Sequence, residues 1–289
     1  MTQGAIVMDG KAVGARVRAE ARERAAAFSQ AHGRPPGLAL IQVGAQADSA
    51  IYVRSKHKAC EEAGIASFAF TPPESVTREE LLALVGRLNA DERVDGILLQ
   101  LPLPPGIDPN EILDAIDPRK DVDGFHPHNT GLIAQRRPGL RPCTPYGVIR
   151  LAAEYGIGLR GRRATVIGAS NIVGKPMALE LMLAGATVTV CHTATRDLRA
   201  EVERAEILVS AAGKAGLVPG EWVREGAAVF DVAINRNEAT GRMVGDVEFE
   251  GAALRAGWIS PVPGGIGPMT IAMLMSNTVE AATAAKVHR

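Results

Sequence analysis

A stripe of three side chains in the stretch IYVRSKHKACEEAG (residues 51–64) has the composition of a reactive site. On a helix, residues four apart are offset by only about 40° around the axis. Tyr52, Lys56 and Cys60 would therefore share one face, which carries an aromatic ring, an ammonium group and a small apolar group. A lysine can act as a base only if part of it is neutral, and burial lowers its pKa from the usual value of about 10.4. Lys56 is the candidate for such a role.

Three other basic side chains surround Lys56 in the sequence. Arg54 and Lys58 fall on other faces of the predicted helix, where a solvated role is expected. Their positive charge is expected to lower the pKa of Lys56 further. His57 is expected at the surface or as a helix cap rather than as a catalyst.

Polar residues follow a predicted strand in DGILLQLPLP (residues 95–104). The strand ends at Gln100, because Pro102 prevents its continuation. A residue at the carboxyl edge of a parallel sheet points toward a ligand crevice. Gln100 is thus either a site residue or an ordinary hydrogen-bonding edge residue. Further on, KDVDGF places Asp121 and Asp123 two residues apart before a glycine. They indicate a turn or a recognition carboxylate, since two ligands are too few for a metal site.

A glycine-rich loop lies between a predicted strand and a predicted helix in VIGASNIVGKPMA (residues 166–178). Gly168 and Gly174 permit a tight turn, and the free N–H groups at the start of the helix suit a pyrophosphate. The usual dinucleotide fingerprint is G-x-G-x-x-G, whereas Ser170 gives this loop the form G-x-S-x-x-x-G. The alternative is a tight turn that binds no ligand. A second small-residue loop, SAAG (Ser210–Gly213), follows a later strand.

The elements that position these residues alternate between strands and helices. Strands are predicted at 37–43, 67–71, 96–101, 164–168, 186–192, 206–213 and 227–234, and helices at 11–30, 49–63, 77–90, 144–156 and 269–285. This order predicts βαβ units with parallel sheets, that is, an α/β fold. Residues 102–145 are rich in proline, aspartate and glycine and are expected to form functional loops.

Two domains are predicted. We expect a three-layer α/β domain over residues 1–143, completed by the last helix and tail (269–289), and a Rossmann-like domain over 144–268. The length of 289 residues suits this division.

The composition excludes several classes of protein. Lys plus Arg and Asp plus Glu both number 32, so the net charge of zero argues against a nucleic-acid-binding protein. No apolar run approaches the roughly 20 residues needed to span a bilayer. The three scattered cysteines predict a reducing compartment without disulfides or zinc, and the first residues lack a secretory signal. A cytoplasmic protein without membrane or nucleic-acid partners is expected.

Six motifs occur in order across nearly the whole chain: YVRSKHKACEEAGI, DGILLQLPLP, KDVDGFHPHNTG, PCTPYGV, GASNIVGKPMA and PVPGGIGPMTIAML. In these motifs the chain closely resembles the bifunctional methylenetetrahydrofolate dehydrogenase/methenyltetrahydrofolate cyclohydrolase family of one-carbon metabolism. The resemblance implies oxidation of 5,10-methylenetetrahydrofolate with transfer of a hydride to NADP, followed by hydrolysis to 10-formyltetrahydrofolate, a product that links the enzyme to purine biosynthesis. It also implies one cleft between the two domains, and a homodimer formed through the second domain.

The family also implies roles for individual residues. Tyr52 would pack on the folate, Lys56 would be the main catalytic residue with Gln100 as its partner, and Asp123 would hold the pterin ring. The loop Pro261–Pro268, including Pro263, Gly264 and Gly265, would line the same cleft. Residues expected to bind the dinucleotide are Gly168, Ala169, Ser170, Ile172, Val173, Gly174, His192, Thr193, Arg196, Ala211, Gly213 and Ile234. No metal is implied.

Four positions depart from the family pattern. The family usually has GRSNIVG, with an arginine where this chain has Ala169, and a basic residue at the position of Ala194. Both basic residues are associated with the 2′-phosphate of NADP, so use of NAD is an open alternative. Ala215 and Ala233 replace a common proline and glycine and are expected to be neutral.

Two other functions compete with this interpretation. One is a nicotinamide-dependent dehydrogenase of the same two-domain plan that acts on an amino acid or a cyclic hydroxy acid. The other is a non-catalytic protein that binds folate or a dinucleotide. The complete set of Lys56, Gln100 and Asp123 argues against both.

Overall fold

The computed structural model describes residues 4–44, 47–237 and 240–287, with the backbone alone for residues 47–53 and 287. The chain divides into two compact units, each assembled from two separate segments. The first unit comprises Met1–Gly14 and Thr144–Thr270, and the second comprises Ala15–Cys143 and Ile271–Arg289. Among the helices that the structure describes, none has the length and apolar character needed to cross a membrane.

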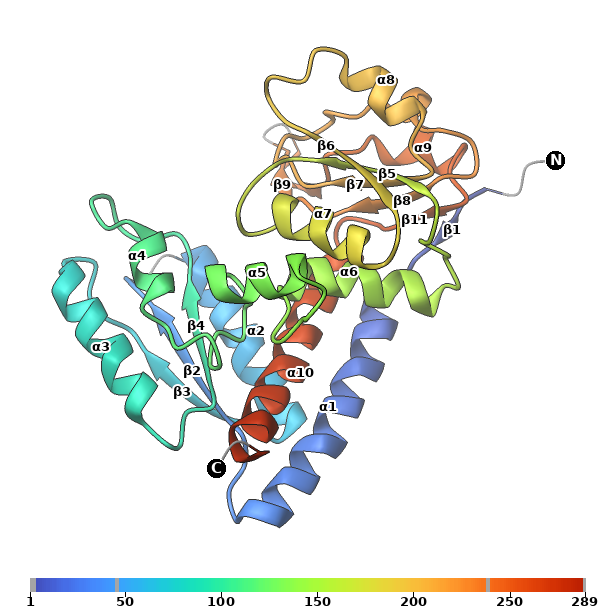
Figure 1. Cartoon of the computed structure of the whole chain (residues 1–289). Coiled ribbons are helices and arrows are strands. Elements are labelled where there is room, and N and C mark those ends of the chain that lie inside the picture. Colours follow the sequence, from blue (N-terminus) through green and yellow to red (C-terminus); the bar gives the residue numbers. More distant parts are fainter. Residues whose placement is uncertain (1–3, 45–46, 238–239, 288–289) are drawn as a thin grey trace. The chain divides into compact units, whose positions relative to one another are not determined.

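The second unit is built around a parallel three-stranded sheet (Figure 1). Its strands β2 (Gly37–Gln42), β3 (Ala66–Phe70) and β4 (Gly96–Gln100) lie in the order β3-β2-β4. Its helices and helical segments are α1 (Gly10–His32), α2 (Ala47–Ala63), α3 (Arg78–Ala90), α4 (Pro109–Asp114), α5 (Pro127–Ala134) and α10 (Ile266–Val287), of which α1 and α10 begin in the first unit.

Helices cover both faces of this sheet. Successive residues of a strand point to opposite faces, and β2 is buried along its whole length. One face packs on α3 and α4 through the buried cluster Ala39, Ile41, Leu81, Leu84, Val85, Leu88, Ile97, Leu99, Ile112 and Leu113. Helix α2 packs on the sheet through β2 and β3. These layers hold the carboxyl ends of β2 and β4, where Gln42 lies beside Gln100, in a fixed register.

Local sequence signals explain where α3 begins. The Thr77 side chain accepts a hydrogen bond from the Glu80 N–H, and the Glu80 carboxylate accepts one from the Thr77 N–H. This reciprocal pair is a capping box, which satisfies two N–H groups that the first turn would otherwise leave unpaired.

The first unit contains a parallel six-stranded sheet in the order β1-β11-β8-β7-β5-β6. Its strands are β1 (Ile6–Val7), β5 (Arg163–Ile167), β6 (Thr187–Cys191), β7 (Ile207–Ser210), β8 (Ala228–Asp231) and β11 (Trp258–Ile259). The remaining elements are α6 (Cys143–Glu154), α7 (Gly174–Leu183), α8 (Leu198–Glu203), η1 (Gly220–Trp222), α9 (Phe249–Ala253) and an antiparallel pair, β9 (Asn235–Arg236) and β10 (Met243–Val244). The expected two-domain α/β fold with a Rossmann-like half is confirmed.

Two expectations about this unit need correction. The first residues were expected in the folate-binding domain, but β1 pairs with β11 and Met1–Gly14 belong to the first unit. The predicted strand 206–213 ends at Ser210, because Gly213 has a φ of +70° and the preceding N–H groups turn toward a buried carboxylate.

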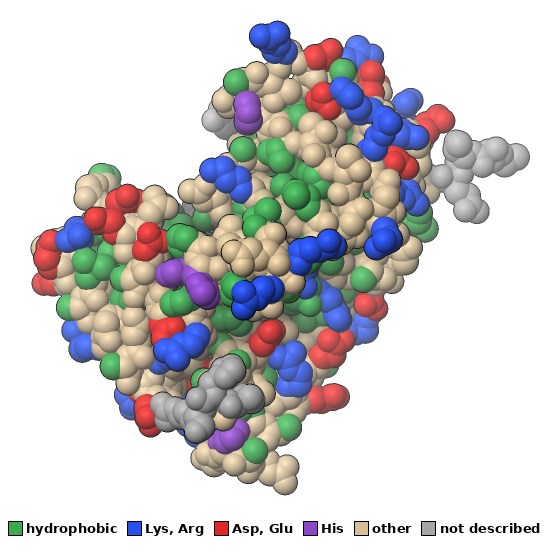
Figure 2. Space-filling model, in the orientation of Figure 1, with side chains coloured by type: hydrophobic (Ala, Val, Ile, Leu, Met, Phe, Trp, Pro, Cys, Tyr) green, Lys and Arg blue, Asp and Glu red, His purple; other side chains and the backbone are tan. Residues whose placement is uncertain are grey.

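On the face drawn in Figure 2, acidic and basic side chains are interspersed.

Candidate active site and dinucleotide site

Lys56 and Gln100 meet at the carboxyl edge of the three-stranded sheet. The Lys56 Nζ donates a hydrogen bond to the Gln100 Oε1 over 2.8 Å. The Gln100 Nε2 donates in turn to the Leu101 carbonyl over 2.9 Å, which fixes the orientation of the amide. Strand β4 ends at Gln100, as Pro102 predicted. The amide therefore presents its oxygen, an uncharged acceptor, to the lysine.

Burial lowers the pKa of Lys56 from its usual value. The negative charge of Asp123 acts in the opposite direction but does not cancel the effect of burial. The expectation that neighbouring cations lower this pKa is not supported, since Arg54 and Lys58 are exposed and water screens their charge. A low pKa increases the neutral fraction of Lys56, which a base requires.

The neighbouring residues of α2 have structural roles. The His57 Nδ1 lies 2.6 Å from the Ser67 hydroxyl on β3, which agrees with a non-catalytic role. Cys60 is fully buried, and burial raises the pKa of its thiol to about 12. The backbone of Tyr52 belongs to α2, four residues before Lys56, but its side chain lies outside the described residues.

The two interpretations of KDVDGF, a turn and a recognition carboxylate, apply to different residues, Asp121 and Asp123. Asp121 is 2% exposed and accepts hydrogen bonds from the N–H groups of Gly124 and His126 and from the Asn129 amide. It therefore builds the turn. Asp123 is half-buried, and burial raises the pKa of its carboxyl to about 6, against the opposing charge of Lys56. At neutral pH Asp123 remains mainly ionised and is available to accept hydrogen bonds from a ligand.

The turn that carries Asp123 is held by a residue that sequence reasoning missed. Asn277, on α10, is 1% exposed, and its Nδ2 donates to the carbonyls of Val122 over 2.9 Å and Arg141 over 2.8 Å. Gly124 is required between these segments, because a Cβ there would lie 2.4 Å from the backbone N of Pro142. The one available signal was an amide in the stretch AMLMSNTVEAA of the last predicted helix.

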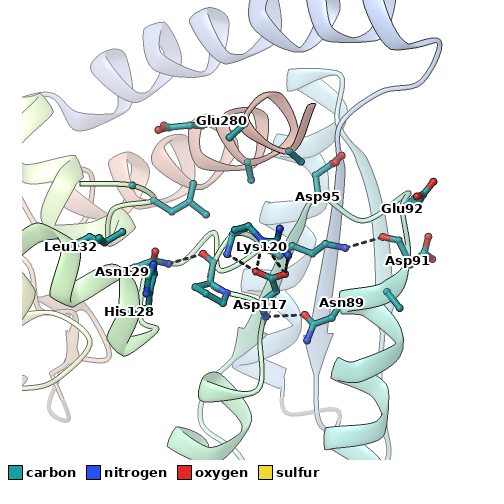
Figure 3. Close-up of a pocket in the computed structure, with 18 residues that line it drawn as sticks. Asn89, Asp91, Glu92, Asp95, Asp117, Lys120, His128, Asn129, Leu132 and Glu280 are labelled. Atoms are coloured by element: carbon teal, nitrogen blue, oxygen red, sulfur yellow. Dashed lines mark hydrogen bonds and ion pairs between the residues drawn. The ribbon is translucent and has the colours of Figure 1, made fainter. Parts of the chain in front are cut away.

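A separate cavity of about 470 Å³ lies at the opposite end of β4 (Figure 3). Asp95, which borders it, precedes the strand that ends in Gln100. The charged groups around it satisfy one another: the Lys120 ammonium donates to the carbonyls of Leu88 and Asp91, and Asp117 pairs with Arg119. This cavity is not part of the candidate active site. No cluster of three or more metal-ligating side chains occurs among the residues that the structure describes.

The glycine-rich loop of the first unit forms a close-packed turn. Gly168, directly after β5, has a φ of +110°, and a Cβ there would lie 2.3 Å from the Ala211 carbonyl oxygen. A Cβ on Gly174 would lie 2.1 Å from the Gly168 oxygen. Neither position can hold a larger residue without moving backbone. The Ser170 hydroxyl, in place of the usual second glycine, accepts hydrogen bonds from the N–H groups of Val173 and Gly174.

This turn lies where α/β sheets bind ligands. Strand β5 lies between β6 and β7, so the strand order reverses at its carboxyl end, the switch point of the sheet. Helix α7 begins there at Gly174, and the exposed apolar side chains of Ile172 and Ile234 belong to neighbouring loops. The loop after β6 contains four exposed residues: His192, Thr193, Ala194 and Arg196. The loop after β7 contains Ala211 and Gly213. These residues fit a dinucleotide.

The loop Pro261–Pro268 lies in the first unit. Its Gly265 N–H donates to the Pro261 carbonyl, and Gly264 has a φ of +109°. The Gly265 carbonyl packs against the start of α1, where a Cβ on Gly10 would lie 1.7 Å from it. Pro263 is exposed. The loop is thus tightly held at one side, with Pro263 open to solvent.

Family models match both halves of the chain. The model for the tetrahydrofolate dehydrogenase/cyclohydrolase catalytic domain matches residues 8–123. The model for the NAD(P)-binding domain of the same family matches residues 142–286.

Individual relatives agree with these models. The bifunctional protein FolD of Acidithiobacillus ferrooxidans is 57% identical over 275 residues, which cover 95% of each chain. The crystal structure of FolD from Campylobacter jejuni superposes with a TM-score of 0.94 at 48% identity, over 97% of this chain and 99% of that one. The Trypanosoma brucei FolD, crystallised with NADP and an inhibitor, gives a TM-score of 0.93 at 41% identity, over 99% of both chains. The chain therefore belongs to the tetrahydrofolate dehydrogenase/cyclohydrolase family, and it is a bifunctional folate enzyme with a dehydrogenase activity, a cyclohydrolase activity and an NAD(P)-binding domain.

Proposed function

We propose that Lys56, Gln100 and Asp123, together with Tyr52, form the site at which the folate is oxidised and then hydrolysed. Loss of a hydride from 5,10-methylenetetrahydrofolate leaves the 5,10-methenyl cation, and the bound dinucleotide supplies the hydride acceptor. The cation carries its charge on the carbon that water must attack. The residues of the chain therefore have to position the pterin, and they have to move protons.

In this proposal Lys56 is the base of the hydrolytic step. The oxygen of water forms a bond to the methenyl carbon while one of its protons passes to the neutral Lys56 Nζ. The bond between that carbon and N5 of the pterin then breaks as the hydroxyl of the adduct loses its proton and becomes the formyl C=O, N5 takes up a proton, and 10-formyltetrahydrofolate is released. The observation that supports this role is the 2.8 Å hydrogen bond from a buried amine to an uncharged acceptor.

Asp123 is proposed to hold the pterin ring. An ionised carboxylate accepts paired hydrogen bonds from an amino group and a ring N–H, and hydrogen bonds to a charged group contribute about 1.5–3 kcal/mol each. Asp121, Asn129 and Asn277 fix the turn on which Asp123 lies. The loop with Pro263, Gly264 and Gly265 is proposed as a further contact to the substrate.

Replacing Lys56 by methionine tests the base. We expect Lys56→Met to lower the cyclohydrolase rate by at least about 100-fold, the usual contribution of a well-placed base, while binding of NADP is retained. The matched control is Lys58→Met on the same helix, because Lys58 is exposed and forms, among the described residues, a single long ion pair with Glu62 at 3.9 Å. The control should stay within about twofold of the wild type, since exposed pairs contribute little. A Lys56→Met enzyme that keeps half of the wild-type hydrolysis would rule out this role.

We further propose that residues 15–143 with α10 bind the folate and that the first unit binds NADP. The dinucleotide residues are those around Gly168–Gly174 and the loops after β6 and β7. NADP is proposed as the preferred cofactor. Its preference over NAD is expected to be smaller than in relatives with basic residues at these positions, because Ala169 and Ala194 contribute no positive charge. Within the part of the chain that the structure describes, the exposed Arg196 guanidinium has no partner, so it is free to contact the 2′-phosphate.

A cytoplasmic homodimer is proposed as the working form. Strand β6 is the last in its sheet and is largely exposed, with Val190 37% and Met182, on the preceding helix, 57% exposed. An open edge of this kind is a surface for pairing with a second copy. The buried free thiols of Cys60, Cys143 and Cys191 suit a reducing compartment. Light scattering would show a monomer if the dimer is wrong.

A further inference from the structure

A buried aspartate lies behind the loop that follows β7. Asp246 is 0% exposed, whereas most candidate site residues of the same unit lie on loops. Its carboxylate accepts five hydrogen bonds, from the N–H groups of Ala212 (2.7 Å), Gly213 (3.3 Å) and Lys214 (2.7 Å), the Ser210 hydroxyl (2.9 Å) and the Asn235 amide (3.0 Å). Three consecutive backbone donors on one carboxylate fix the path of the chain there.

The loop held by Asp246 packs directly on the glycine-rich turn. The Ala211 carbonyl oxygen lies where a Cβ on Gly168 would come within 2.3 Å of it. Gly168 packs in the same way against Gly174, the first residue of α7. A displacement of residues 211–214 would therefore be transmitted to both ends of the glycine-rich turn.

A second carboxylate aligns Asp246 itself. Asp231, 4% exposed at the end of β8, accepts hydrogen bonds from the N–H groups of Asp246 over 3.0 Å and Val247 over 2.8 Å. Gly245 makes this approach possible, because a Cβ there would lie 1.8 Å from Asp231 Oδ2. The Asp231 N–H donates to Ser260, next to the Pro261–Pro268 loop. The sequence GDV (245–247) thus serves to place one carboxylate.

We propose that Asp246 is a positioning residue for the dinucleotide: it contacts no cofactor atom but holds the Ala212–Lys214 N–H groups, and through Ala211 the Gly168 turn, in the conformation that binds NADP. This inference rests on the proposed dinucleotide site. It assigns to Asp246 an effect on one of the two activities, because hydrolysis of the methenyl compound consumes no dinucleotide.

The substitution Asp246→Asn tests the proposal. It preserves the shape of the side chain but replaces one acceptor oxygen by an NH₂ group that faces N–H donors. We expect the Michaelis constant for NADP and the dissociation constant measured by calorimetry to rise at least about 10-fold, the equivalent of about 1.4 kcal/mol. Cyclohydrolase activity, assayed on methenyltetrahydrofolate without dinucleotide, should remain within about twofold of the wild type, since that reaction uses no dinucleotide.

Glu206→Gln is the matched control. Glu206 also accepts a hydrogen bond from a backbone N–H, that of Arg163 over 3.0 Å, but it lies at the other end of β7. Its substitution should leave NADP binding unchanged. Equal loss of both activities in Asp246→Asn would indicate a general structural role and overturn the proposal. So would unchanged NADP binding.

A milder variant covers the case in which Asp246→Asn does not fold. Ser210→Ala removes one of the five donors and keeps the carboxylate. It should raise the dissociation constant of NADP about threefold, the effect expected from one hydrogen bond of modest strength. Cyclohydrolase activity should be retained. An unchanged constant would contradict the proposal. A wild-type enzyme that fails to bind NADP would contradict the proposed dinucleotide site instead.

Discussion

At the scale of single residues, Lys56 differs from the other cations of its helix in its burial and its hydrogen-bond partner. Lys56 and Arg54 lie on the same helix, but only Lys56 has a buried amine with an amide acceptor at 2.8 Å. A carboxylate in place of that amide would attract the ammonium form and raise the pKa of the lysine. The choice between glutamine and glutamate at position 100 therefore determines the pH range of the base.

Gln100→Glu should move the pH profile of hydrolysis. We expect the alkaline rise in cyclohydrolase rate to shift upward by about 1–2 pH units, because an opposite charge at hydrogen-bond distance favours the charged lysine. The control is Gln42→Glu, since Gln42 lies opposite Gln100 in the register of β2 and β4 but donates to Gly44. Rates should be measured from pH 6 to 10. An unshifted profile in Gln100→Glu would mean that Lys56 is not the titrating base.

Cofactor preference should respond to a single positive charge at position 169. Charge-assisted hydrogen bonds to phosphate contribute about 1.5–3 kcal/mol, and each 1.4 kcal/mol is about tenfold in affinity. Ala169→Arg should thus lower the Michaelis constant for NADP at least several-fold and leave that for NAD nearly unchanged. Ala169→Met, similar in length but uncharged, should leave both unchanged. If the wild type already prefers NADP over NAD by about a thousandfold, another basic group binds the 2′-phosphate of NADP.

At the scale of elements, the sequence predicted those with a clear period and missed the short ones. Strand β2 and helices α1 and α3 begin and end within three residues of their predicted positions, since each repeats its apolar pattern over several turns or pleats. Strands β1, β9, β10 and β11 have two residues each, which is too few to show any period. The pairing of β1 with β11 also joins positions far apart in the chain, such as Ile6 and Trp258.

The residues of the candidate site were predictable where a local sequence pattern marks them, and not where their role depends on distant partners. A stripe on a helix and the end of a strand singled out Lys56 and Gln100, the family resemblance paired them, and the structure joins them by a hydrogen bond. Asn277 and Asp246 were missed because their roles depend on backbone groups more than 30 positions away, such as the Val122 carbonyl and the Ala212 N–H. No local pattern marks a buried amide or carboxylate as the holder of a distant loop.

Helix α10 should stabilise the Asp123 turn through one amide. Asn277→Leu keeps the volume but leaves the buried Val122 and Arg141 carbonyls without this donor, and we expect a loss of about 2–5 kcal/mol in the free energy of unfolding. Affinity for folate should fall as well. Thr278→Val is the control, because the Thr278 hydroxyl donates only within its own helix, to Leu274. Urea denaturation should show a smaller loss for Thr278→Val, and equal losses would refute the role of Asn277.

At the scale of the whole molecule, buried carboxyls set the pH dependence of stability. Burial raises the pKa of Asp231 to about 7, whereas an unfolded aspartate has a pKa of about 3.9. The native state therefore holds more protons than the unfolded state between about pH 4 and 7, and the free energy of unfolding falls as the pH rises through this window. Asp123, with a pKa raised to about 6, contributes with the same sign.

Asp231→Asn should flatten this dependence. One titrating proton contributes at most about 1.4 kcal/mol per pH unit, so the slope of the unfolding free energy between pH 5 and 7 should become less negative by up to that amount. Glu206→Gln is the control, because a hydrogen bond from Arg163 lowers the pKa of Glu206 and keeps it ionised throughout the window. Equal slopes for Asp231→Asn and the wild type, by urea denaturation at several pH values, would show that Asp231 is not the group responsible.

Because the second unit is assembled from two separate segments, its first segment is synthesised long before the segment that completes it. Ribosomes add roughly 5–20 residues per second, so residues 15–143 emerge early, but they lack Ile271–Arg289 until the intervening residues have also been synthesised. Until then the Val122 and Arg141 carbonyls beside Asp123 have no Asn277 to bond with. The second unit is therefore begun early and completed late, and a nascent chain that has not yet reached Asn277 cannot have the finished Asp123 turn.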